Sequence, residues 1–189
     1  IPWIFFFFFL TGGASCIISQ KEMVKKIYFP RVVLPIVHVT CQLVNMLLSF
    51  IIIFAVLIIS GKGLNVTALL YLPIVVLAEY MLAISIAFVS SAVTVYLRDL
   101  EHILIIVAMA WQFLSPVIYS IDMVPEEFVG IFMLNPMTPI IAAYRDIFYY
   151  GKRPEVNTLL YGFVFSLILL IVGHFIFDHL KKHFAEEIG

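Results

Sequence analysis

The sequence contains few charged residues and is mostly apolar. Only 12% of its 189 residues are Asp, Glu, Lys or Arg, about half of the usual share of about 25%. Hydrophobic residues make up 63%, with eighteen Phe and nine Tyr, against about 45–50% in ordinary globular proteins. A globule of 21.5 kDa could not bury this much apolar surface. The composition therefore excludes an ordinary soluble domain and predicts a chain that lies mostly in lipid.

The sequence also lacks the groups that several functional classes need. Eleven basic and twelve acidic residues give a net charge of −1, which leaves no basic surplus for binding nucleic acid. An ATP-binding loop would be glycine-rich and end in Gly-Lys-Ser or Gly-Lys-Thr, and neither Gly61-Lys62 nor Gly151-Lys152 has that context. The five histidines show no His-Glu-x-x-His pattern for a metal. We therefore expect a non-catalytic chain that holds no metal and no cofactor.

Cysteine is also scarce, and both Cys16 and Cys41 lie in long apolar runs. We expect them to be small buried side chains and not a disulfide or a metal pair. The sequence begins at Ile1 without an initiator Met, and it shows neither the basic start nor the cleavage site of a signal peptide. We therefore expect a fragment that lacks an N-terminal part.

Five apolar segments are long enough to cross a membrane, since a span needs about 20 apolar residues. Backbone groups in lipid must be satisfied within their own segment, which favours helices, and residues 51–57 lack the alternation of a barrel strand. We predict an all-α integral membrane protein with a single transmembrane domain over residues 1–189. Its five visible spans cover approximately residues 1–20, 33–60, 69–96, 103–121 and 157–177.

Lysine and arginine are unevenly divided between alternate loops, and the richer set is expected in the cytoplasm. Seven basic residues form one set, namely Lys21, Lys25, Lys26, Arg31, Arg98, Lys181 and Lys182. Four form the other set, namely Lys62, Arg145, Lys152 and Arg153. This predicts that the tail after Phe177 lies inside the cell and that Ile1 lies outside. One further span before Ile1 would return the N-terminus to the cytoplasm.

The first cytoplasmic loop, residues 21–31, combines a charged and an apolar helical face. One face would carry Lys21, Glu22, Lys25 and Lys26, and the opposite face Met23, Val24, Ile27 and Tyr28. Glu22 precedes Lys26 by four residues, the favourable order for a helical ion pair, and Pro30 ends the helix. The pattern predicts a short amphipathic helix in the membrane interface. It is either a basic topology anchor or a contact for a partner.

The second cytoplasmic loop, residues 96–102, is short and rich in titratable groups. These are Arg98, Asp99, Glu101 and His102. The loop is either a polar contact surface or a solvated turn.

The external segment from residue 120 to residue 157 is too apolar for an ordinary solvated loop. Its apolar stretches 128–134 and 140–150 are too short to cross, and Asn135-Pro136-Met137-Thr138-Pro139 separates them. The two prolines break any helix. We expect two short helices that enter the outer leaflet, return, and roof a cavity or pore mouth. The alternative is a hairpin on the membrane surface without a role in transport.

Glu79 is an acidic residue inside a predicted span, at a cost of about 2.5–3.5 kcal/mol if it is charged. It could face a hydrated pathway or be held protonated. If the helix begins at Pro73, it could instead reach the headgroups. Tyr80 and Trp111 are further pathway candidates because aromatic faces in a pore could let sugars slide, although buried packing is the commoner role.

Several motifs occur in the order and spacing of a known family. They are Pro2-Trp3 with Phe5-Phe6, Lys25-Lys26-Ile27-Tyr28-Phe29-Pro30-Arg31, Leu34-Pro35, Tyr96-Leu97-Arg98-Asp99, Ser115-Pro116-Val117-Ile118-Tyr119 and Leu134-Asn135-Pro136-Met137-Thr138-Pro139. With these motifs the sequence resembles the membrane subunits of type-2 ABC exporters, most closely those for lipid-linked polysaccharide, O-antigen and wall teichoic acid.

The resemblance implies a six-span permease of a bacterial or archaeal cytoplasmic membrane, of which the first span is missing here. Such permeases work as homodimers beside a separate ATP-binding subunit. The residues that would contact this ATPase are Lys21, Glu22, Lys25, Lys26, Phe29, Pro30, Arg31, Arg98, Asp99 and Glu101. Those near an outer gate of re-entrant helices would be Ser115, Pro116, Tyr119, Asn135, Pro136, Pro139 and Arg145.

We therefore expect the transmembrane subunit of an ATP-driven exporter that moves a lipid-linked polysaccharide or teichoic acid polymer. An ion-coupled carrier would usually bury several ionisable residues and show internal repeats, whereas Glu79 stands alone here. One alternative is a permease of the same type for drugs or other hydrophobic small molecules. Another is an integral-membrane enzyme for lipid phosphates, whose one candidate site would be the cluster at residues 98–102.

Overall fold

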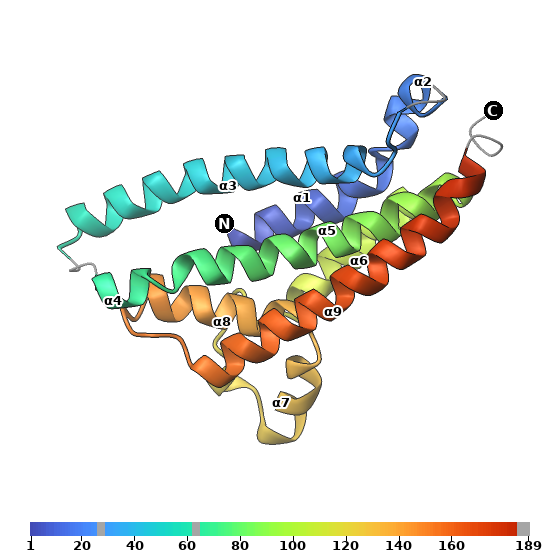
Figure 1. The fold of residues 1–189 in the computed structure, drawn as a ribbon. Helices are drawn as coiled ribbons and strands as arrows, with labels where there is room; N and C mark the ends of the chain where they lie inside the picture. The colour runs from blue at the N-terminus through green and yellow to red at the C-terminus, as the bar shows by residue number, and fades with distance from the viewer. Residues whose placement is uncertain (26–28, 62–64, 185–189) are drawn as a thin grey trace.

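All regular structure in the described residues, which are 1–25, 29–61 and 65–184, is helical (Figure 1). This confirms the predicted all-α membrane fold in a computed structural model of the chain. The α-helices are α1 (Pro2–Ser15), α2 (Lys21–Val24), α3 (Val33–Ile59), α4 (Val66–Leu69), α5 (Leu72–Tyr96), α6 (Leu100–Phe113), α7 (Glu126–Met133), α8 (Met137–Phe148) and α9 (Val156–Leu180). Short 3-10 turns occupy Ile18–Gln20, Ile121–Met123 and Lys181–His183.

Three segments are long and apolar enough to cross a membrane by themselves: Val33–Ile59, Val66–Tyr96 and Val156–His183. Two bent pairs pass the same test only when joined. The pair at the N-terminus, Pro2–Ser15 with Ile18–Val24, bends by 47°, and α7 with α8 bends by 103°. The described chain thus has three to five candidate spans.

Helix α6 is shorter than the span expected at residues 103–121. It has 14 residues and ends at Phe113. Pro116 explains this end, because a proline disfavours helical geometry at the residue before it and cannot donate a backbone hydrogen bond. The chain beyond Leu114 instead forms the turn that leads to α7.

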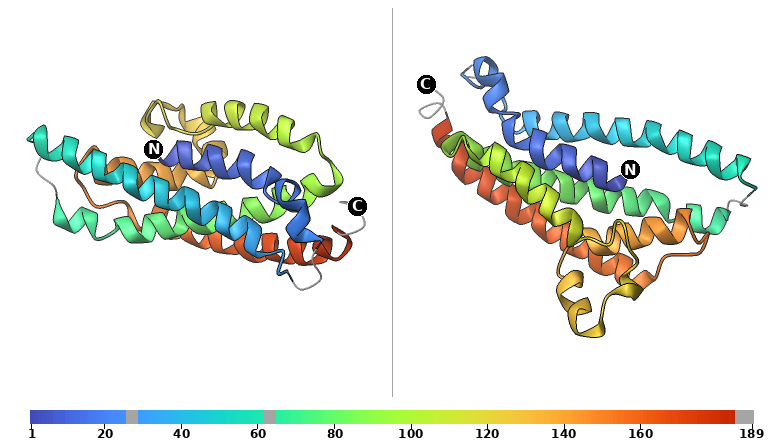
Figure 2. Two further views of the ribbon diagram at one scale, coloured as in Figure 1. Left: turned by 90° about the horizontal axis from the view of Figure 1, so that it is seen from above. Right: turned by 180° about the vertical axis from the view of Figure 1, so that it is seen from behind.

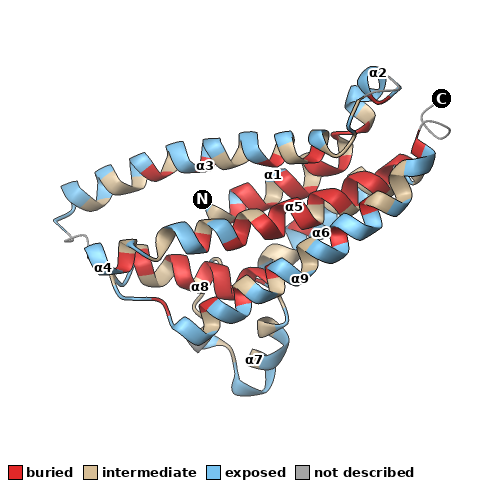
Figure 3. Ribbon diagram, viewed as in Figure 1, coloured by how far each residue is buried: buried red, intermediate tan, exposed pale blue. Residues whose placement is uncertain are grey.

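Helix α5 is the centre of the bundle, with α1, α8 and α9 packed against it (Figures 1 and 3). Viewed from above, α1 lies between α3 and α6 (Figure 2). Helices in lipid gain little from hydrophobic contact with one another, so small side chains that let backbones approach are favoured. Gly13 of α1 lies on Ala87 of α5, and Gly173 of α9 lies on Ser85. The Ser85 hydroxyl also donates to the carbonyl of Leu169 at 2.5 Å.

Helix α3 presents a long apolar surface outward (Figure 3). Ile51 and Ile52 are 63% and 67% exposed, which suits hydrocarbon and not water. Cys41 lies on this exposed side, so the expectation that it is buried was wrong, whereas Cys16 is buried as expected. Periodicity alone does not say which side of an apolar helix its neighbours cover.

The amphipathic helix predicted within residues 21–31 is shorter in the structure than this range. Regular helix covers one turn, Lys21–Val24, and Lys25 is its C-cap. Val24 is buried, while Lys21, Glu22, Met23 and Lys25 are exposed. Lys26, Ile27 and Tyr28 lie outside the described residues.

The contact between α5 and α9 can be tested with a glycine variant. A Cβ on Gly173 would lie 2.8 Å from the Ser85 carbonyl oxygen, so Gly173→Ala must push the helices apart. We expect a loss of about 1–3 kcal/mol of unfolding free energy, as for other overpacked sites. The measurement is reversible unfolding in detergent or bicelles.

Gly130→Ala in α7 is the matched control. A Cβ there would meet nothing within 4 Å, and alanine favours a helix over glycine. Equal stability losses for the two variants would contradict the packing described above.

Candidate functional site

The α7–α8 hairpin is fastened to the end of α6 by Asn135. Its side-chain amide nitrogen donates to the Leu114 carbonyl at 3.1 Å and to Ser115 Oγ at 2.8 Å. Its side-chain oxygen accepts from the Met137 backbone N–H at 3.0 Å. Asn135 therefore fixes both the sharp turn between the two helices and the position of that turn over α6.

Two further side chains tie this region together. Arg145 of α8 donates through Nη2 to the Pro116 carbonyl at 2.8 Å. The Tyr119 hydroxyl donates to the Phe113 carbonyl at 2.7 Å, where the last turn of α6 leaves its carbonyls unpaired. Pro139 packs on α9, because a Cβ on Gly162 would lie 3.1 Å from its Cγ.

The residues predicted for an outer gate thus gather in one assembly of the end of α6, the hairpin and the start of α9. They are Ser115, Pro116, Tyr119, Asn135, Pro136, Pro139 and Arg145. The prolines account for the shape: Pro136 stands at the N-cap of α8 and Pro139 in its first turn, where a missing N–H costs nothing.

An aromatic pocket of about 370 Å³ lies among three parts of the chain: the start of α1, helix α8, and the segment that follows α6. Its ring-bearing lining residues are Trp3, Tyr119, Tyr144, Tyr149 and Tyr150, and its polar ones include Ser120 and Arg145. Trp3 and Tyr144 are buried, whereas Tyr149 and Tyr150 are exposed. Rings therefore form both the floor and the rim of this pocket, beside a guanidinium group.

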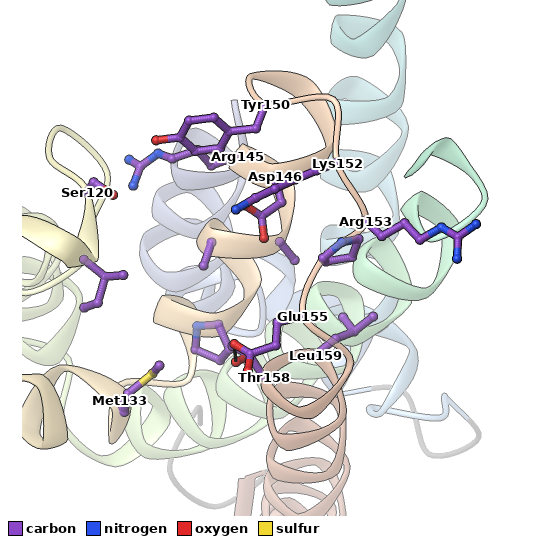
Figure 4. Close-up of a pocket in the computed structure, with 15 residues that line it drawn as sticks. Ser120, Met133, Arg145, Asp146, Tyr150, Lys152, Arg153, Glu155, Thr158 and Leu159 are labelled. Carbon is purple, nitrogen blue, oxygen red and sulfur yellow. Dashed lines mark hydrogen bonds and ion pairs between the residues drawn. The ribbon is translucent and has the colours of Figure 1, made fainter. Parts of the chain in front are cut away.

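A second, more polar pocket of about 290 Å³ lies where α8 meets the start of α9 (Figure 4). Its charged groups largely pair with each other or with near neighbours. Lys152 Nζ lies 3.2 Å from Asp146 Oδ1, and the Thr158 hydroxyl donates to Glu155 Oε2 at 2.8 Å. Figure 4 shows the guanidinium groups of Arg145 and Arg153 pointing in opposite directions. This pocket is therefore less suited to a large charged ligand than its composition suggests.

Glu79 lies inside the protein, between α5 and α8. Its carboxyl is fully buried, and Glu79 Oε2 accepts a hydrogen bond from the Tyr144 hydroxyl at 2.6 Å. Its other oxygen, Oε1, has no hydrogen-bond partner among the described residues. Glu79 therefore links a spanning helix to the hairpin, and its burial does not fit the suggestion that it reaches the headgroups.

The other two pathway candidates make packing contacts. The Tyr80 hydroxyl lies 2.8 Å from Thr40 Oγ1 and connects α5 to α3. The Trp111 ring packs edge-on against Phe6 at 5.2 Å. Trp111 also lines an apolar groove of about 520 Å³, together with residues that include Ile86, Phe132 and Phe165.

The predicted contact residues, in the two loops expected to lie in the cytoplasm, are at the end of the bundle opposite the hairpin, near the C-terminus (Figure 1). Those that are exposed are Lys21, Glu22, Lys25, Pro30, Arg98 and Asp99, while Phe29, Arg31 and Glu101 are partly buried. Arg31 turns inward and donates to the Lys181 carbonyl at 2.5 Å. Lys26 lies outside the described residues.

Sequence reasoning did not find Tyr144, Tyr149 and Tyr150. Tyr144 meets Glu79 across 65 positions of sequence, and no local pattern signals such a pair. A cluster of tyrosines beside Arg145 at the end of an apolar stretch was the available signal.

Comparison with known proteins identifies the family. A family model described as ABC-2 type transporter matches residues 1–149. The chain belongs to the ABC-2 type transporter family. The resemblance seen in the sequence motifs is confirmed, and this ABC-2 permease is a multi-pass protein of the cell membrane. Membership also implies an ATP-binding partner chain.

Relatives of this ABC-2 permease include two proteins that share one name with each other. It is 31% identical over 190 residues to the O-antigen export system permease protein RfbA of Myxococcus xanthus, covering 100% of this chain and 73% of that protein. It is 31% identical over 186 residues to a protein of that name from Klebsiella pneumoniae, covering 98% of this chain and 71% of the relative. The similarity therefore covers both loops and the hairpin.

The bond between Glu79 and Tyr144 gives a prediction about stability. Tyr144→Phe leaves both carboxyl oxygens without the hydroxyl, so we expect a loss of about 1–3 kcal/mol of unfolding free energy. Glu79→Gln keeps an acceptor for that hydroxyl, and its loss should be smaller. Tyr161→Phe, on an exposed ring of α9, is the control and should behave as wild type in the same unfolding assay. A Tyr144→Phe protein as stable as the control would contradict the assigned link.

Proposed function

We propose that this permease exports a polysaccharide carried on a membrane lipid, as a homodimer with separate ATP-binding subunits that hydrolyse the ATP. The names of its relatives, O-antigen export permeases, support a glycan as the transported substrate. The sequence holds no phosphate-binding loop of its own. The permease itself would then be a non-catalytic subunit.

The observation that carries the glycan assignment is the aromatic pocket at the hairpin. A sugar ring has apolar faces that stack on aromatic rings and hydroxyl groups that need hydrogen-bond partners. The pocket offers both, because Tyr149 and Tyr150 stand at its rim beside Arg145. Arg145 lines the same pocket, and its hydrogen bonds to the Pro116 and Val117 carbonyls are made through Nη2.

A second candidate substrate is a hydrophobic small molecule, and one observation favours it. The groove beside Trp111, between α6, α7 and α9, is almost wholly apolar and holds about 520 Å³. Apolar pockets of this size suit drug-sized ligands. The two substrate classes therefore predict different effects of substitution. Replacing Tyr150 should impair export of a glycan, whereas replacing Trp111 should impair export of a drug. A lipid-phosphate enzyme has no such support, because Arg98 and Asp99 line none of the pockets described here.

The ATP-binding partner is proposed to dock on the cytoplasmic end. Lys21 and Lys25 are exposed on and beside α2, and Arg98 with Asp99 is exposed in the neighbouring loop. Exposed charges of both signs suit a partner surface that is itself charged, since complementary charges set register and speed association.

The docking assignment predicts the effect of charge reversal. Lys21→Glu combined with Lys25→Glu should weaken binding of the ATP-binding subunit about tenfold, which corresponds to about 1.4 kcal/mol. Arg153→Glu, also an exposed cation but at the opposite end, is the matched control. The measurement is co-purification together with a binding titration in nanodiscs. Wild-type affinity in the double variant would count against docking at α2.

The glycan assignment predicts which tyrosines matter. Tyr150→Ala should lower polymer export about two- to tenfold, the range expected when one ring contact is lost. Tyr161→Ala, which removes another exposed ring outside the pocket, should leave export unchanged. Export is measured as polymer at the cell surface in a strain that depends on this permease.

Two outcomes would speak against a glycan at this pocket. One is equal export by the Tyr150→Ala and Tyr161→Ala proteins. The other is a loss of hydrophobic-dye efflux in Trp111→Ala without any change in polymer export, which would favour the small-molecule alternative.

A further inference from the structure

The C-terminal end of α9 accepts hydrogen bonds from both cytoplasmic segments. Arg31 Nη1 donates to the Lys181 carbonyl at 2.5 Å, and the Tyr96 hydroxyl donates to the Leu180 carbonyl at 2.8 Å. Arg31 is the last residue of the first loop, and Tyr96 is both the last residue of α5 and the first residue of the second loop. The Lys181 carbonyl also accepts from the backbone N–H of Phe184, and a cation is favourable at the C-terminus of a helix because of the helix dipole. The two segments therefore meet at a single helix end.

Aromatic packing holds this helix end in place. Phe184, just beyond α9, is fully buried. Its ring lies 5.7 Å from that of Phe177 and 6.3 Å from that of Tyr96. Phe177 in turn lies 5.2 Å from Phe88 of α5. The end of α9 is thus part of a packed cluster and not a frayed terminus.

Helix α9 connects this cluster to the outer hairpin. Gly173 packs on Ser85 at mid-helix, and Gly162 packs on Pro139 of α8. From Gly162 to Leu180 a helix rises about 27 Å at the usual 1.5 Å per residue. Because α9 is unbroken over Val156–Leu180, a shift imposed at its cytoplasmic end reaches α8 without an intervening hinge.

Arg31 differs from its neighbours in where it points. Lys21 and Lys25 are exposed, whereas Arg31 is partly buried and bonded to α9. The exposed lysines are placed to bind a partner, and Arg31 is placed to connect that segment to the bundle.

We propose that Arg31 is a positioning residue that couples the cytoplasmic segment to α9. Displacement of the segment by the ATP-binding partner pulls on the end of α9, and α9 passes the movement to Pro139 and the hairpin as a rigid body. The inference depends on the proposed function, because it needs a partner that binds residues 21–25.

The test uses the complete transporter, the permease with its ATP-binding subunit, in proteoliposomes. Three quantities are measured: affinity for that subunit, ATP hydrolysis, and polymer exported per ATP hydrolysed. Arg31→Gln should keep the affinity within about twofold and lower export per ATP about two- to tenfold, the range of known coupling contributions. Arg31→Lys keeps the positive charge and can still donate a hydrogen bond to the Lys181 carbonyl. Its export per ATP should therefore be close to that of the wild type.

Controls separate coupling from docking and from folding. The Lys21→Glu, Lys25→Glu protein should lose affinity, while any partner that does bind is still coupled to export. Lys182→Gln, which removes a neighbouring exposed cation without touching the bond, should behave as wild type. If Arg31→Gln does not fold, Tyr96→Phe removes the second hydrogen bond while keeping the ring, and should lower export per ATP in the same way.

Three results would overturn the inference. One is a loss of partner affinity in Arg31→Gln as large as that in the double lysine variant, which would make Arg31 a docking residue. Another is unchanged export per ATP in both Arg31→Gln and Tyr96→Phe. The third is a failure of Arg31→Lys to restore export per ATP. Unchanged affinity in the double lysine variant would instead refute the proposed docking site and leave the Arg31 measurement interpretable.

Discussion

The close approach of α1 and α9 to α5 is the constraint on which the rest of the structure depends. Lipid gives helices little hydrophobic reason to associate, so contact between backbones must supply the stability. Gly13 and Gly173 allow it on the two sides of α5. The serine and threonine hydroxyls of α5 donate to nearby carbonyls, as Thr94 does to Ser90 at 2.7 Å, and therefore need no water. Helices α1, α5 and α9 therefore form a closely packed core that runs between the two ends of the bundle.

These two ends have opposite chemistry, and the core explains how they can act together. The end expected in the cytoplasm presents Lys21, Lys25 and the loop before α6, while the opposite end presents the hairpin with its ring-lined pocket. Helix α9 touches both, through Arg31 at one end and Pro139 near the other. Glu79 adds a second tie between core and hairpin through Tyr144. In the proposed exporter such a connection would carry movement from the side of the membrane where the ATP-binding partner docks to the hairpin on the other side.

The sequence could predict whatever depends on local pattern. Long apolar runs predicted α3, α5 and α9, and Pro136 and Pro139 predicted two short helices separated by a break. The family motifs pointed to the residues predicted for an outer gate, and the structure brings these residues together. Features set by packing between distant segments could not be predicted. Arg31 meets Lys181 across 150 positions, and Cys41 is exposed because no described helix covers that side of α3. The short α6 was foreseeable in principle, since Pro116 disfavours helical geometry at Ser115.

The orientation of the bundle in the membrane is the central claim, because docking, coupling and the gate all reverse if it is inverted. The most direct measurement is labelling of single cysteines in intact cells with an impermeant maleimide, in a protein whose Cys16 and Cys41 are replaced by serine. We predict that Arg153→Cys is labelled from outside and that Arg98→Cys is labelled only after the membrane is permeabilised. Labelling of Arg98→Cys in intact cells, with Arg153→Cys protected, would contradict the account.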